Sequence, residues 1–76
     1  SMTISELGSE LIRMYHSAPE NEKVTFIHLF GIKYGSTLLK NKYGAGEIIK
    51  ASGLNDSYKT EVQKGIKLSK YVSYTE

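Results

Sequence analysis

Side chains suited to contacting nucleic acid gather between residues 57 and 70. If a helix begins near Asn55 or Asp56 and directs Tyr58 and Val62 inward, four polar residues recur along its outward side. They stand at i, i+3, i+4 and i+7, and are Thr60, Gln63, Lys64 and Lys67. Lysine ammonium groups neutralise phosphates, and a glutamine amide can pair with the edge of adenine. The candidate chemistry is therefore binding rather than catalysis.

Each candidate contact residue has an expected partner on double-stranded DNA. The phosphate contacts are assigned to Lys59, Lys64, Lys67 and Lys70. Thr60 and Gln63 are assigned to base edges, and Ser57, near the start of the helix, to phosphates or bases. Asp56 and Glu61 would repel phosphate, so we expect Glu61 to lie off the contacting side.

The segment before this helix carries a family resemblance. The residues EIIKASGL (47–54) resemble the first helix and turn of the helix-turn-helix DNA-binding superfamily. In that superfamily a short helix ends in a glycine, an aliphatic residue plugs the core, and a polar residue caps the recognition helix. Gly53, Leu54 and the caps at 55–57 match these roles, and Val62 stands where the family buries an aliphatic. The resemblance covers residues 46–67 and implies double-stranded DNA as partner and a role in transcription.

Two positions depart from the family pattern. Four residues before the turn glycine the family favours alanine, because two helices cross closely there, and this chain has Ile49. Six residues after the glycine the family favours valine or isoleucine, and this chain has Lys59. Tyr58 fills that buried place if the turn is rearranged.

The distribution of charge supports two further interpretations. Seven lysines in residues 40–75 face only three acidic residues, whereas residues 1–39 hold three basic and four acidic side chains. A basic half of this kind attracts polyanions. The alternatives to DNA are an ordinary solvated lysine face, or a protein-interaction module (an adaptor or inhibitor) whose basic face meets an acidic partner.

Motifs for catalysis, metals and cofactors are missing from the sequence. His16 and His28 fall on different expected elements without an HExxH pattern, and His28 is expected to be a hydrogen-bonded core residue. No serine stands in GxSxG. The stretch 31–37 lacks the lysine of a phosphate loop, and Gly44-Ala45-Gly46 fails as a dinucleotide fingerprint. We therefore expect no enzyme activity, no catalytic or metal-binding residue, no cofactor and no small-molecule ligand.

Length and composition predict one small domain over residues 1–76. Ser1 before Met2 has the appearance of a cloning scar, and an apolar content of 39% suffices for one core. Without cysteine the fold has no disulfide, so self-association as a homodimer is the reinforcement that remains. No leader or membrane-spanning run is visible, and a cytoplasmic location is expected.

Periodicity predicts an all-α fold with four helices. Helix 3–16 follows from a Thr3–Glu6 capping box, and Pro19 suits the first turn of the next helix. Residues 23–34 alternate like a strand but also recur like a helix; a helix over 20–34 is favoured because no partner strand is evident. Leu38 and Leu39 are expected to return to the core.

The remaining elements surround the turn glycine. A helix is expected over 46–52, ended by Gly53. The last helix either stops at Gly65, or continues to Lys70 with a buried stripe of Tyr58, Val62, Ile66 and Ser69. Continuation is favoured, with a short extended tail at the end.

Overall fold

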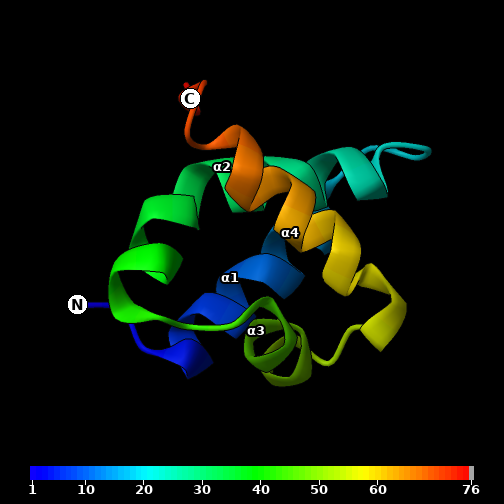
Figure 1. The fold of residues 1–76 in the computed structure, drawn as a ribbon. Helices are drawn as coiled ribbons and strands as arrows, with labels where there is room; N and C mark the ends of the chain where they lie inside the picture. The colour runs from blue at the N-terminus through cyan, green and yellow to red at the C-terminus, as the bar shows by residue number, and fades with distance from the viewer. Residues whose placement is uncertain (76) are drawn as a thin grey trace.

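The fold is a small assembly of four α-helices, seen in a computed structural model that describes residues 1–75 (Figure 1). The helices are α1 (Ile4–Ser17), α2 (Lys23–Asn41), α3 (Ala45–Ser52) and α4 (Lys59–Leu68), with a short 3₁₀ helix, η1 (Asp56–Tyr58), before α4. The described chain has no strand, which confirms the predicted all-α class. α1 packs on α2 and α3, and α4 lies along α2. Within residues 1–75 we find no helix with both the length and the apolar character that a membrane crossing requires.

The first helix forms as its capping box predicts. The Thr3 hydroxyl accepts a hydrogen bond from the Glu6 amide at 3.1 Å, and the Glu6 carboxylate accepts one from the Thr3 amide at 2.8 Å. These two bonds satisfy amide groups that the first turn of a helix leaves without partners. Leu7 and Leu11 then lie fully buried on one side of the helix.

The second helix is correctly predicted as a helix, but both of its predicted ends are wrong. It begins at Lys23 because Asn21 adopts a left-handed φ of 69°, and the Glu22 amide bonds back to the Pro19 carbonyl at 3.0 Å. Pro19 therefore lies in a turn before α2 rather than in its first turn. The helix also runs seven residues beyond 34, to Asn41, where Lys42 in the left-handed region ends it.

Glycines inside α2 serve close packing instead of ending the helix. A Cβ built on Gly31 would stand 2.6 Å from the Cα of Gly65 on α4, and one on Gly35 would collide with Ser69. Real Cβ atoms essentially never come that close. The two helices thus meet backbone to backbone, a contact that any larger side chain would prevent.

The core lies where α1, α2 and α3 converge beneath α4. Its fully buried large side chains come from all four helices and are Leu7, Leu11, Ile27, Phe30, Leu38, Ile48, Ile49 and Val62. Leu38 returns to the core as predicted, but Leu39 does not: its side chain is 53% exposed. Leu39 points about 100° away from Leu38 around α2, toward a side of the helix on which it stays half exposed.

The last helix continues through Gly65, as favoured from the sequence, and ends at Leu68, two residues before Lys70. Val62 is buried and Tyr58, Ile66 and Ser69 are partly buried, so the expected inward stripe forms. Residues 69–71 make a turn, and residues 72–75 have no regular structure.

A charged network ties α1 to α2. The Glu10 carboxylate accepts hydrogen bonds from Arg13 Nη2 at 2.9 Å and from the Tyr34 hydroxyl at 2.6 Å. The bond from Arg13 and that from Tyr34 outweigh the opposing effect of burial, and hold the pKa of Glu10 at about 2 instead of 4.5.

Gly65→Ala should destabilise the protein by about 1–2 kcal/mol. The new methyl group would lie 2.5 Å from the His28 carbonyl oxygen and 2.9 Å from the Gly31 Cα, and backbone cannot step aside as a flexible side chain can. Overpacking of about 1–3 kcal/mol therefore outweighs the gain of roughly 1 kcal/mol in helix propensity. Urea unfolding followed by circular dichroism measures the difference.

Gly46→Ala in α3 is the matched control for this change. Its methyl group would meet only the Lys59 side chain, 3.6 Å away, so the propensity gain should leave the protein as stable as the wild type or more so. If Gly65→Ala also unfolds at the wild-type urea concentration or above, the backbone contact between α2 and α4 does not exist in solution.

The Glu10 network predicts a defined pH dependence of stability. Because the folded-state pKa is lowered from 4.5 to about 2, the contribution of Glu10 is complete above 4.5 and is lost as the pH falls toward 2. The urea midpoint of the wild type should exceed that of Glu10→Gln near neutral pH, and the gap should close across this window. Glu20→Gln, at an exposed turn, removes the same charge as a control. A gap between wild type and Glu10→Gln that stays constant down to pH 2 contradicts the network.

Candidate nucleic-acid interface

The turn between α3 and α4 ends α3 as the sequence predicts, but α4 begins later than predicted, at Lys59, after the short helix η1. Gly53 lies in the left-handed region (φ 81°) and its amide bonds to the carbonyls of Ile49 and Lys50 at 3.2 and 3.3 Å, which ends α3. The half-buried Leu54 packs against the core. Asn55 then caps η1, its side-chain oxygen accepting a hydrogen bond from the Ser57 amide at 2.9 Å.

A short 3₁₀ turn explains the lysine at the usual aliphatic position. Because η1 occupies 56–58, Tyr58 is the residue that turns inward, and Lys59 is exposed at the start of α4. The Tyr58 ring packs edge-on against Tyr15 of α1, with centroids 5.7 Å apart, and the two hydroxyls are 3.2 Å apart. Tyr58 thus turns inward, as the rearranged-turn hypothesis expects, but it is only partly buried there.

The other departure, Ile49, is accommodated because the close crossing lies elsewhere on α3. Ile49 is buried in the core, and α1 approaches the backbone of α3 closely at Gly8. A Cβ added to Gly8 would stand 2.6 Å from the Ala51 Cβ. The small residue that this fold needs is therefore on the neighbouring helix, so the alanine that the family favours at 49 is not required.

The candidate contact residues all reach solvent, and four of them share one side of α4. We call Thr60, Gln63, Lys64 and Lys67 the outward face; each is exposed. Val62 and Gly65 lie buried beneath them. The remaining candidates are also exposed: Ser57, Lys59 and Lys70.

Glu61 lies off the outward face, held against α2. Its carboxylate is 2.7 Å from His28 Nε2 and accepts a second hydrogen bond from Lys64 at 3.3 Å. The bond to His28, followed by that to Lys64, lowers the pKa of the Glu61 carboxyl. The Glu61 carboxylate therefore lies between His28 of α2 and Lys64 of the outward face, and Lys64 shares its charge with that carboxylate.

Sequence reasoning missed this His28–Glu61 pair. His28 is hydrogen-bonded as expected, but its side chain is 30% exposed and lies at the edge of the core rather than within it. The two residues stand 33 positions apart on different helices, so no short-range pattern in the sequence indicates that they pair.

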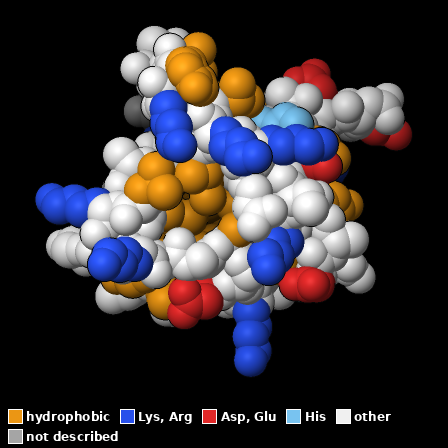
Figure 2. All heavy atoms as spheres, in the orientation of Figure 1, with side chains coloured by type: hydrophobic (Ala, Val, Ile, Leu, Met, Phe, Trp, Pro, Cys, Tyr) orange, Lys and Arg blue, Asp and Glu red, His pale blue; other side chains and the backbone are white. Residues whose placement is uncertain are grey.

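A hollow lies beside the outward face, between α4 and the end of α2. We call it the groove; it has a volume of about 320 Å³ and is lined by Leu39, Gln63, Ile66, Lys67 and Lys70. Figure 2 shows hydrophobic side chains exposed there, with lysine or arginine side chains around them. Leu39, which was predicted to lie in the core, is exposed instead. Together with Ile66 it forms the apolar surface of the groove, which we call its floor.

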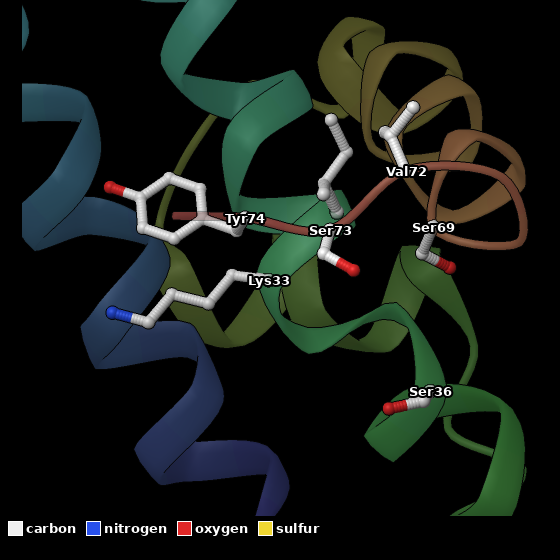
Figure 3. A pocket seen from close by; sticks show the side chains of 7 residues that line it. Lys33, Ser36, Ser69, Val72, Ser73 and Tyr74 are labelled. Atoms are coloured by element: carbon white, nitrogen blue, oxygen red, sulfur yellow. The ribbon is translucent and has the colours of Figure 1, made fainter. Parts of the chain in front are cut away.

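A second hollow, also of about 320 Å³, lies between α2 and the segment that follows α4 (Figure 3). The Lys33 ammonium lies 5.2 Å from the centre of the Tyr74 ring, and the two side chains run side by side along the hollow. Hydroxyl groups of Ser36 and Ser73 line it further. The contact between Lys33 and Tyr74 holds the C-terminal segment against α2.

Comparison with known families finds a match that spans nearly the whole chain. The family model described as an HTH-like domain matches residues 3–75. The resemblance seen in residues 46–67 is thereby confirmed and extends to all four helices. No curated protein and no solved structure matches the chain.

Proposed function

We propose that this chain, which belongs to the HTH-like domain family, binds double-stranded DNA through α4 and acts as a small transcriptional regulator or accessory DNA-binding factor. One observation carries the proposal. The outward face presents two lysines, a glutamine and a threonine to solvent on the helix that follows the glycine turn, while Val62 and Gly65 anchor that helix from below.

The lysines supply the affinity. Each ammonium group that neutralises a phosphate releases condensed counterions, so binding is tight at low salt and weakens steeply as salt rises. Lys59 is exposed at the N-terminal end of α4, Lys67 near its C-terminal end and Lys70 in the turn that follows, so the cations span the whole helix. Contacts between these lysines and the phosphate backbone of DNA along that length fix the orientation of α4 on the duplex.

The polar residues between the lysines supply the selectivity. Gln63 lies midway along α4 with an exposed amide, the group that pairs with adenine in the major groove. Thr60 stands one turn earlier and offers a hydroxyl to a base or a phosphate. Dimerisation, which would pair two copies of α4 on adjacent half-sites, remains a prediction.

Removing two lysines from the outward face should weaken DNA binding and reduce its salt dependence. For Lys64→Ala/Lys67→Ala we expect about tenfold weaker binding to a labelled duplex at low salt. The slope of log K against log salt should fall by about 1.8, since each lost phosphate contact contributes roughly 0.9. Fluorescence anisotropy at several salt concentrations measures both quantities.

A matched variant separates this local effect from net charge. Ser5→Glu/Ser9→Glu changes the net charge by the same amount, at exposed positions on α1, which packs on α2 and α3. It should retain the wild-type salt slope. Equal weakening by both double variants would mean that the protein attracts DNA only through its overall charge, and would refute α4 as the contacting helix.

A further inference from the structure

We propose that the groove between α2 and α4 is a docking site for an acidic, amphipathic helix of a partner protein. The groove has an apolar floor and a cationic rim, which match the apolar face of such a helix and the carboxylates that flank that face. Neither the floor nor the rim depends on DNA binding, because both consist of residues that line the groove.

The floor of the groove is apolar surface contributed by two helices. Leu39 of α2 is 53% exposed, and Ile66 of α4 is partly buried beside it. Exposed apolar surface in a hollow rimmed by polar residues is typical of interaction sites, since leaving it in water is unfavourable. A volume of about 320 Å³ is enough to admit one or two apolar side chains.

The rim of the groove is cationic. Lys67 and Lys70 line it together with Gln63, and among residues 1–75 no acidic side chain lines it. A partner segment must therefore carry carboxylates beside its apolar anchors. An amphipathic helix with leucine or phenylalanine at i and i+4, and glutamate or aspartate flanking them, meets both requirements.

Duplex DNA fits the rim but not the floor. Phosphates can contact the lysines, yet a polyanionic backbone offers the apolar side chains of Leu39 and Ile66 nothing to bury. Because Gln63 and Lys67 also belong to the outward face, a docked acidic helix would cover part of the DNA-contacting surface. The two ligands should then compete.

A peptide titration tests the docking site without DNA. The probe is a fluorescein-labelled peptide of about 15 residues, roughly four helical turns, with leucine and phenylalanine aligned on one side and glutamates elsewhere. Two controls are a scrambled peptide of equal composition and one with its apolar residues replaced by serine. We expect the aligned peptide to bind about tenfold or more tightly than either control.

Variants of the protein locate the binding. Leu39→Ser removes an exposed apolar side chain from the floor of the groove. It should weaken binding of the aligned peptide about tenfold and leave duplex binding unchanged. Leu68→Ser makes the same change on α4 at a residue of similar exposure (42%) that does not line the groove, and should bind the peptide as the wild type does. Equal binding of all three peptides, or no effect of Leu39→Ser, overturns the docking site. If the wild-type protein binds the aligned peptide but does not bind duplex DNA, the DNA proposal fails and the docking site stands.

Discussion

The backbone contact between α2 and α4 is the constraint on which the rest of the structure depends. Gly31 and Gly65 let these helices touch without side chains between them. That approach buries Val62 and brings Glu61 within hydrogen-bonding distance of His28. Because one side of α4 is fixed against α2, the opposite side faces solvent, and the lysines on that side are exposed.

The same crossing shapes the groove. Because α4 lies so close along α2, the end of α2 projects beside it, and Leu39 is left at the edge rather than covered. One geometric arrangement thus yields both a cationic helix face and an apolar hollow next to it. The two proposals above use this arrangement: a polyanion along α4, and a more selective, partly apolar ligand at the border of that face.

Short-range sequence patterns predicted which segments form helices. Where a helix ends and which side chains are exposed depended on contacts between helices as well. The Thr3–Glu6 box and the left-handed Gly53 depend on residues within a turn of one another, so the sequence revealed them. Gly35, by contrast, has the same appearance whether it ends a helix or packs against Ser69, and only the partner helix distinguishes these cases. The exposure of the four residues of the outward face could be predicted because helical spacing places them on one side; the exposure of Leu39 could not, since it depends on where α4 lies.

The central claim is that the outward face of α4 meets duplex DNA. Backbone amide chemical shifts of the labelled protein, recorded while duplex is added at low salt, test it most directly. We expect shifts concentrated in residues 57–70 that diminish as salt is raised, with the amides of α1 unchanged. Shifts centred on α1, or none at a concentration of duplex that saturates binding, would contradict it.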